Sequence, residues 1–304
     1  IENYKVGGLT KYGLDYQTVK HLNPKLVYCS ITGFGQSGPC AHKAGYDAMI
    51  QGEGGLMSLT GEPNGMPMKV GVALVDVMTG LYSCNAILAA LMARYQTQAG
   101  QHIDIALLDV QTAALANQGM NYLTTGDNPK RLGNGHPNIV PYQTFATAEG
   151  NLILAIGNDV QFAKFCQQAK LDELVQDVRF QTNAQRVVNR ALLIPIIAAK
   201  LAGETTQYWI DCLEQVAVPC GAVNTLAQVF KHPQIQHRKM VREVPDKEGC
   251  LHTTIASPIN LSETPLEYRN APPELGQNSL SILQETLLYD DLKVKVLFDQ
   301  DIVS

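Results

Sequence analysis

The chain has 304 residues, of which 45% are hydrophobic and 17% charged, with 25 glycines and 15 prolines. This balance is typical of a folded globular protein and excludes an intrinsically disordered chain. Lysine and arginine number 23 and aspartate and glutamate 28, so the net charge of −5 excludes the basic surface of a nucleic-acid-binding protein. A small-molecule partner is favoured.

The first half of the chain predicts alternating helices and strands. A short helix is expected at 16–22, followed by a strand at 25–32 that is rich in β-branched and aromatic residues. Apolar residues at helical spacing predict a helix over 77–95, and 102–108 alternates as a strand before a helix over 110–123. Alternation with short links favours an α/β layer with a parallel sheet.

The longest apolar stretch, 70–93, is interrupted by Asp76, Gly80, Ser83 and Asn85. Uninterrupted runs of about 20 apolar residues are needed to cross a bilayer. We therefore expect a buried helix of a globular domain here, and no membrane partner.

Seven cysteines are scattered along the chain without a Cys-x-x-Cys pair. An odd number at irregular spacing indicates free thiols in a reducing compartment, which predicts a cytoplasmic location. The sequence has no HExxH motif and no Cys/His cluster, so we assign no metal site.

The second half begins with a segment of Gly, Asn, Pro and His at 124–143 that predicts a loop. A strand is expected at 151–156, and Asn158 or Asp159 is placed to cap a helix over 160–170. These elements predict a second, smaller unit. Further elements are expected as helices at 183–201 and 206–216, a hairpin at 241–244 and 251–255, and a last helix at 279–288.

The glycine-rich sequence GFGQSG at 33–38 matches the pattern of a dinucleotide-binding loop and follows a predicted strand. Pro39 and Cys40 come next, and no helix is predicted from the last glycine. A pyrophosphate needs that helix N-terminus. The segment is therefore predicted to be a turn-forming loop.

A single carboxylate interrupts the apolar segment GVALVDVMTG, near the start of the predicted helix. Aspartate is a preferred N-cap, so Asp76 is predicted to accept a hydrogen bond from the backbone N–H of Met78 or Thr79. The functional alternative is a partly buried carboxylate near helix dipoles that acts as a covalent nucleophile. The two roles are compatible, and the residues alone favour the cap.

Seven ordered segments carry a resemblance to one family. The segments are IENYKVGGLTKYGL, NPKLVYCSITGFGQSGP, AGYDAMIQGEGGLMSLTG, GVALVDVMTGLYSCNAILAAL, GQHIDIALLDVQ, GNGHPNIVPYQTF and APPELGQN. Together they resemble the class III CoA-transferase (CaiB/BaiF) family nearly end to end. The resemblance is strongest to the branch of the family that moves CoA between dicarboxylic acids, as in succinyl-CoA:glutarate transfer.

The resemblance implies an α/β fold with a Rossmann-like large domain built from both chain ends, an inserted small α+β domain, and an interlocked ring dimer. The family's first strand-loop-helix region would precede Ile1. The implied segments are a large domain at 1–125, a linker with a glycine-rich loop at 126–144, the small domain at 145–235, a hairpin and linker at 236–256, and a C-terminal return to the large domain at 257–304.

The resemblance also assigns catalytic roles. Family members use an aspartate in the segment matched by GVALVD as the nucleophile, which assigns that role to Asp76 and outweighs the capping interpretation. Gly133, Asn134 and Gly135 match the family's glycine-rich loop, which closes over the reacting carbonyl and offers N–H groups to an oxyanion.

A CoA-binding role is implied for a second group of residues. Asn3, Tyr4 and Lys11 match the stretch that contacts CoA in the family, and Tyr46 and Asp47 are assigned to the same site. CoA is expected as a substrate rather than a tightly bound cofactor. The carboxylic acid is the other expected partner.

The implied reaction proceeds through an aspartyl anhydride and an aspartyl-CoA thioester. Two alternatives stay open. Racemase relatives of the family place a His at the position of Tyr46, and Tyr is a poor base at neutral pH, so an acyl-CoA racemase is disfavoured. The chain starts without Met, which leaves a non-catalytic, truncated CoA-binding fragment as the other alternative.

Overall fold

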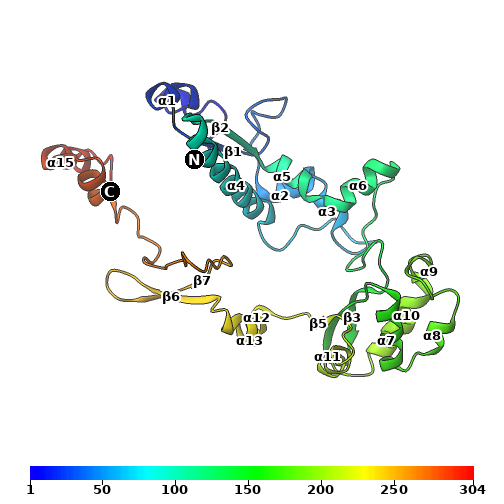
Figure 1. Cartoon of the computed structure of the whole chain (residues 1–304). Coiled ribbons are helices and arrows are strands. Elements are labelled where there is room, and N and C mark those ends of the chain that lie inside the picture. The colour runs from blue at the N-terminus through cyan, green and yellow to red at the C-terminus, as the bar shows by residue number, and fades with distance from the viewer. The chain divides into compact units, whose positions relative to one another are not determined.

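The computed structural model describes residues 1–304 and divides into two compact units, Ile1–Ala222 and Val223–Ser304 (Figure 1). Both units mix helices with strands, so the predicted α/β class is confirmed at this level. The resemblance implies a division into five segments, from the large domain at 1–125 to the C-terminal return at 257–304. The two units do not test this more detailed division, which stays a prediction.

The sheet at the start of the first unit is parallel, as predicted. Strand β1 (Tyr28–Thr32) pairs with β2 (His102–Ala106) in a register that runs from Tyr28 opposite His102 to Thr32 opposite Ala106. On the other side of β1, Glu2 forms a parallel bridge to Ser30. Before β1, a 3₁₀ turn (Thr10–Tyr12) leads into helix α1 (Tyr16–Leu22), which has the predicted bounds.

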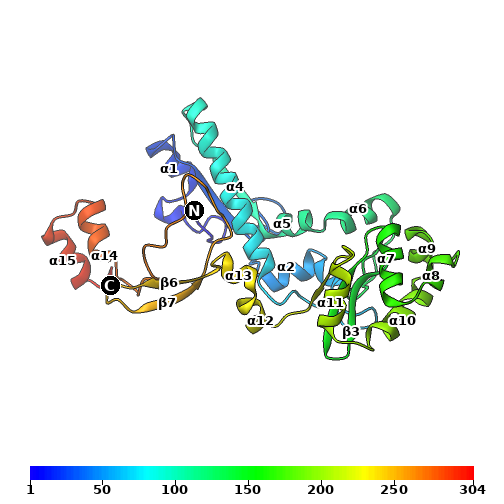
Figure 2. The same cartoon turned by 60° about the horizontal axis from the view of Figure 1, so that its bottom comes forward.

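Helix α4 (Leu74–Thr97) dominates the rest of this part (Figure 2). One face of α4 packs on β1, β2 and the following helix α5. The predicted helix over 110–123 is in fact two helices that meet at Ala116, whose φ is 46°. The other helices here are α2 (Asp47–Glu53), α3 (Leu56–Leu59), α5 (Leu107–Ala114) and α6 (Ala116–Thr125).

The prediction that the apolar helix is buried is wrong within this chain. By length and composition alone α4 is able to span a membrane, and 22% of its most apolar stretch is buried. Several exposed large apolar residues form a second stripe along the helix, because their intervals of four, seven, four and three positions keep them on one face. We call this set the α4 stripe; it consists of Val77, Leu81, Leu88, Met92 and Tyr95.

A second sheet, antiparallel and three-stranded, lies later in the first unit. Its strands are β3 (Tyr142–Thr147), β4 (Gly150–Ala155) and β5 (Cys220–Ala222), in that order. The strand predicted at 151–156 is β4, whereas β3 and the short β5 were not predicted. The helices of this part are α7 (Asp159–Ala169), α8 (Glu173–Gln176), α9 (Asn183–Val188), α10 (Arg190–Leu201) and α11 (Thr206–Glu214).

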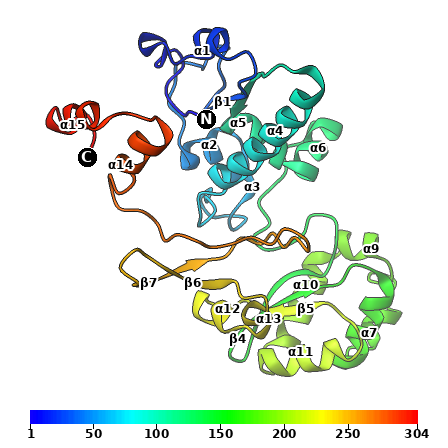
Figure 3. The same ribbon diagram turned by 60° about the vertical axis from the view of Figure 1, so that its left-hand side comes forward.

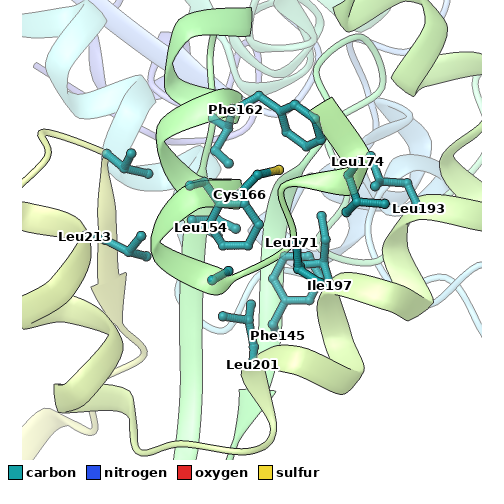
Figure 4. Close-up of a cluster of buried hydrophobic side chains, with 14 of the residues drawn as sticks. Phe145, Leu154, Phe162, Cys166, Leu171, Leu174, Leu193, Ile197, Leu201 and Leu213 are labelled. Atoms are coloured by element: carbon teal, nitrogen blue, oxygen red, sulfur yellow. The ribbon is translucent and has the colours of Figure 1, made fainter. Parts of the chain in front are cut away.

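The core of this part lies between the sheet and its helices (Figure 4). Leu154 from β4, Phe162 from α7 and Ile197 from α10 are buried there. The helices begin where the sequence supplies a cap. Asn158, as predicted, accepts a hydrogen bond from the backbone of Gln161 at the start of α7.

One cation is completely buried in the same core. Arg186 donates from Nε to the carbonyl oxygen of Val140 at 2.8 Å and from Nη1 to that of Phe180 at 3.0 Å. Its Nη2 pairs with Asp159 at 2.8 Å, and the guanidinium lies over the ring of Phe162. The loop before β3 is therefore attached to α7 and α9 by a single side chain.

The second unit contains the predicted hairpin, formed by β6 (Val241–Pro245) and β7 (Leu251–Ile255) (Figure 3). The predicted last helix is short and irregular, and the terminal helix α15 was not predicted. The remaining elements are α12 (Leu226–Lys231), α13 (Pro233–His237), α14 (Ser279–Ser281) with a π-helical continuation (Ile282–Thr286), and α15 (Asp291–Asp299).

We expect Arg186→Met to lower the free energy of unfolding by about 3 kcal/mol, because two buried carbonyl groups lose their donor. Urea denaturation followed by circular dichroism measures the change. Arg179→Met is the matched control, since Arg179 pairs with Asp177 at the surface and its loss should change little. Equal stability of the two variants would contradict this account.

Candidate active site

A cavity of about 490 Å³ lies in the first unit, beside the start of α4. Four of the residues predicted for the site are on its wall: Asn3, Tyr4, Tyr46 and Asp76. The wall also includes Ile31 and Thr32 at the carboxyl end of β1 and several residues of the loops that follow. Ligands of α/β proteins bind at this end of parallel strands, so the location favours a ligand site.

Two glycines bring the loops of the wall together. A Cβ atom on Gly33 would lie 2.6 Å from the Cα of Gly45, and one on Gly45 would lie 2.5 Å from the Cα of Gly33. The backbones therefore touch, and no other residue type fits at either position. After β1 no helix begins until Asp47, which confirms that the GFGQSG segment is a turn-forming loop.

The predicted helix cap at Asp76 is wrong. Asp76 is the third residue of α4, and the N-cap position is Ala73, whose side chain makes no capping bond. The cap comes instead from α2: Asp47 Oδ1 accepts hydrogen bonds from the backbone N–H of Val75 at 2.8 Å and of Asp76 at 3.4 Å. The carboxyl group of Asp76 is therefore not used for capping.

The cap itself is held in place by a buried amide. Gln51, with no exposed surface, donates from Nε2 to Asp47 Oδ2 at 2.7 Å and accepts from the backbone N–H of Val70 at 2.8 Å. One face of α2 thus fixes both the loop before α4 and its first turn.

The Asp76 carboxyl group accepts no hydrogen bond and forms no ion pair in the chain. Its pKa is raised above the ordinary value, mainly because partial burial disfavours the charged form and in addition because the Asp47 carboxylate is near. A carboxylate without hydrogen-bond partners, at a cavity wall and in the first turn of a helix, is available to attack an electrophile.

The other predicted site residues lie outside the cavity wall. Lys11 is in the 3₁₀ turn, with its Nζ 4.7 Å from the centre of the Tyr12 ring. Asp47 serves as the cap of α4. The Gly133–Gly135 loop is attached to another turn, because Gly133 donates to the carbonyl oxygen of Gly61 at 3.1 Å. The structure does not bring this loop to Asp76.

Among the wall residues that the sequence analysis did not predict, three have side chains that can interact with a polar ligand. Lys5 and Lys43 add two positive charges, and Thr79 adds a hydroxyl. Lys5 follows directly after the IENY segment, which is a signal that the sequence offered. Nothing in the sequence distinguishes Thr79 from an ordinary helical threonine.

Comparison with known proteins gives the family. The model of CoA-transferase family III matches residues 1–279, so the chain belongs to this family and is an enzyme of the CoA-transferase class. It is 48% identical over 285 residues to the succinate–glutarate CoA-transferase of Agrobacterium fabrum, a match that covers 94% of this chain and 71% of that protein. It is 39% identical to human succinyl-CoA:glutarate CoA-transferase, over 100% of this chain and 69% of that one.

Solved structures agree with the family. A crystal structure of a CaiB/BaiF family protein from Brucella suis superposes with a TM-score of 0.81 at 48% identity, and the match covers 93% of this chain and 74% of that one. A crystal structure of a Mycobacterium tuberculosis protein at 26% identity superposes with a TM-score of 0.82, and the match covers 92% of this chain and 75% of that one. The mixed α/β fold is thus that of CaiB/BaiF proteins.

We expect Asp47→Asn to keep the cap oxygen but remove a charge that raises the Asp76 pKa. A carboxylate nucleophile must be ionised to attack, so an enzyme that uses Asp76 in this role loses activity as the pH drops through the pKa of Asp76. The variant should therefore stay active to lower pH than the wild type, as the acid limb of the pH–rate profile will show.

Two variants complete this test. Asp47→Ala removes the cap as well and should cost about 1 kcal/mol of stability. Asp109→Asn changes the net charge equally at an exposed position of α5 and should leave the acid limb in place. An unshifted limb in Asp47→Asn would show that the two carboxyl groups are not coupled.

Proposed function

We propose that this chain transfers CoA from succinyl-CoA to a dicarboxylic acid such as glutarate, with Asp76 as the nucleophile. The relatives from Agrobacterium fabrum and from human, whose names state these substrates, support the substrate class. The observation that carries the assignment of Asp76 is its carboxylate at the cavity wall, free of hydrogen bonds and ion pairs.

The proposed first half-reaction forms two covalent intermediates. A carboxylate oxygen of Asp76 attacks the thioester carbon of succinyl-CoA, and the C–S bond breaks to give a mixed anhydride and CoA thiolate. A thiol pKa of about 8.5 makes this a good leaving group. The thiolate then attacks the aspartyl carbonyl carbon and expels succinate, which leaves CoA on Asp76 as a thioester.

The second half-reaction repeats these steps in reverse with a new acid. The acceptor carboxylate attacks the aspartyl thioester, thiolate leaves, and its return to the acceptor carbonyl produces the new acyl-CoA. Asp76 is released as a carboxylate. The energy of the thioester bond is kept at each stage, because an anhydride and a thioester are both activated acyl groups.

The charges of the wall suit these substrates. Lys5 and Lys43 are placed to attract the phosphates of CoA or the second carboxylate of the acid. Asn3 and Tyr4, on the same wall, are proposed to contact CoA directly. Lys11, which is not on the cavity wall, is proposed to contact a more distant part of CoA.

We keep the glycine-rich loop Gly133–Gly135 as the proposed lid. In the structure Gly133 is bonded to Gly61, and Arg131 donates to the carbonyl oxygen of Gly65 at 2.6 Å. Closure over Asp76 therefore requires that these bonds open, or that the loop of a second copy closes the site.

The racemase alternative has less support. It needs a base that moves a proton at the carbon next to the thioester, and the wall has Tyr46 where racemase relatives have His.

An interlocked homodimer is proposed as the working form, in a cytoplasmic location. The α4 stripe supports the dimer, since five large apolar side chains on one helix stay exposed within the chain. The five side chains lie on one face of α4, which suits packing against another helix or sheet.

We expect Asp76→Asn to lower kcat by several orders of magnitude, because an amide cannot form the anhydride or the thioester. The fold should not be weakened. A carboxyl group with a raised pKa loses stabilising effect as the pH rises through that pKa, so removing its charge at neutral pH leaves the melting temperature equal or slightly higher.

Mass spectrometry of the CoA esters formed from succinyl-CoA and glutarate measures the transfer. In the wild type, hydroxylamine added during turnover should leave a hydroxamate at Asp76, detected by peptide mass. Asp109→Asn is again the charge-matched control. Transferase activity retained in Asp76→Asn would refute the proposed nucleophile.

For the dimer, light scattering of the purified protein should give twice the chain mass of 33.1 kDa. Leu88→Glu, within the α4 stripe, should yield monomers or aggregates because a charge then replaces an apolar contact. Gln96→Glu adds the same charge at an exposed polar position of the same helix and should remain dimeric. A monomeric wild type would refute the dimer.

A further inference from the structure

Thr79 lies one helical turn after Asp76 on α4 and is on the wall of the same cavity. Its side chain is 2% exposed, and Oγ1 is buried without a hydrogen-bond partner. Buried hydroxyls are nearly always bonded, because an unpaired one destabilises the folded state. An unpaired hydroxyl next to a reactive carboxylate therefore calls for an explanation.

The usual explanation does not apply to Thr79. A helical threonine commonly donates to the carbonyl oxygen four residues earlier. Thr97, Thr112 and Thr125 do so, at 3.1, 2.8 and 2.9 Å. Thr79 makes no such bond to Val75, so its hydroxyl keeps its proton free for another acceptor.

Helix geometry gives one such acceptor. Residues three apart lie on the same helix face, with Cβ atoms about 5–6 Å apart. Side chains also lean toward the N-terminus, so that of Thr79 covers the turn that contains Asp76. Both residues line one cavity, which places the hydroxyl beside the group that becomes acylated.

We propose that Thr79 Oγ1 donates a hydrogen bond to the carbonyl oxygen of the acylated Asp76 side chain. The proposal rests on the function assigned above. When CoA thiolate attacks the aspartyl carbon, a C–S bond forms and the π electrons move to this oxygen. As the oxyanion collapses, the C–O bond to succinate breaks, and Thr79 keeps its proton throughout.

The same donor serves the second half-reaction. The acceptor carboxylate attacks the aspartyl thioester at the same carbon, so negative charge develops on the same oxygen. Because the donor and the acylated residue belong to one helix, their relative position is set before either substrate binds. Such preorganisation is what makes a hydrogen bond stabilise a transition state more than a ground state.

Ser83 provides a control within the same helix. Its hydroxyl is also buried, one turn beyond Thr79. It differs in its surroundings, since it lies near the buried thiol of Cys29 and is not on the cavity wall. A change in rate that follows substitution of Thr79 but not of Ser83 can therefore be attributed to the position of Thr79 on the cavity wall.

Single-turnover formation of the enzyme–CoA thioester from succinyl-CoA tests the proposal, with the thioester measured by intact-protein mass. Thr79→Val, which has almost the same shape, should slow this step about 10²-fold, the effect typical of one oxyanion donor. KM for succinyl-CoA should change little, Thr79→Ser should restore most of the rate, and Ser83→Ala should match the wild type.

Stability separates a chemical role from a structural one. Removal of an unpaired hydroxyl should leave Thr79→Val as stable as the wild type or more so. Wild-type rates in Thr79→Val, equal losses in the Val and Ser variants, or a destabilised Val variant would each overturn the proposal. If the wild type itself forms no thioester, the proposed function fails, whatever the Thr79 variants do.

Discussion

The site depends on one contact, the hydrogen bond that the Asp47 carboxylate accepts from the backbone of the first turn of α4. It joins two helices whose contacting residues are 28 positions apart. Because Asp47 satisfies the free N–H groups of Val75 and Asp76, the helix begins at a fixed point beside the cavity and needs no cap of its own. Asp76 is thereby oriented without using its side chain. Gln51 holds Asp47 in turn, so a buried amide that is not on the cavity wall helps to fix where the Asp76 carboxylate lies.

The other loops of the cavity wall are positioned by the carboxyl end of the parallel sheet. β1 ends at Thr32, and the chain must then turn away from the sheet, which it does through the loop that begins at Gly33. The contact of Gly33 with Gly45 brings the end of that loop back to the strand, so that Lys43 and Tyr46 reach the same cavity as Asp76. A glycine pattern that resembles a dinucleotide fingerprint thus serves to pack two loops. The absence of a following helix was the feature that distinguished the two interpretations from the sequence.

Helices and strands that depend on residues close by in the sequence were predictable. Helix α1 has its predicted bounds because Asp15 caps it through Thr18, three residues away, and Asn158 does the same for α7. The parallel pairing of β1 and β2 followed from the alternation of helices and strands. The cap of α4 was not predictable, because the sequence offers Asp76 at the right place and gives no sign that Asp47 will arrive there. The position of the glycine-rich loop and the exposure of the α4 stripe also depend on tertiary contacts, so periodicity alone was misleading about burial.

The closeness of the Asp47 and Asp76 carboxyl groups affects the proposed reaction through the pKa of Asp76. In the proposed mechanism Asp76 exchanges acyl groups with carboxylic acids, so transfer in both directions is easiest when the carboxyl pKa values of Asp76 and of these acids are similar. An isolated aspartate is somewhat more acidic than a glutamate-type carboxyl, whose ordinary pKa is about 4.3. Partial burial and the Asp47 charge shift the pKa of Asp76 upward, in the direction of such acids. The charge that caps α4 therefore adds to the effect of burial and brings Asp76 closer in basicity to the dicarboxylates proposed as its partners. One side chain from α2 thus contributes both to the position of Asp76 and to its proposed reactivity.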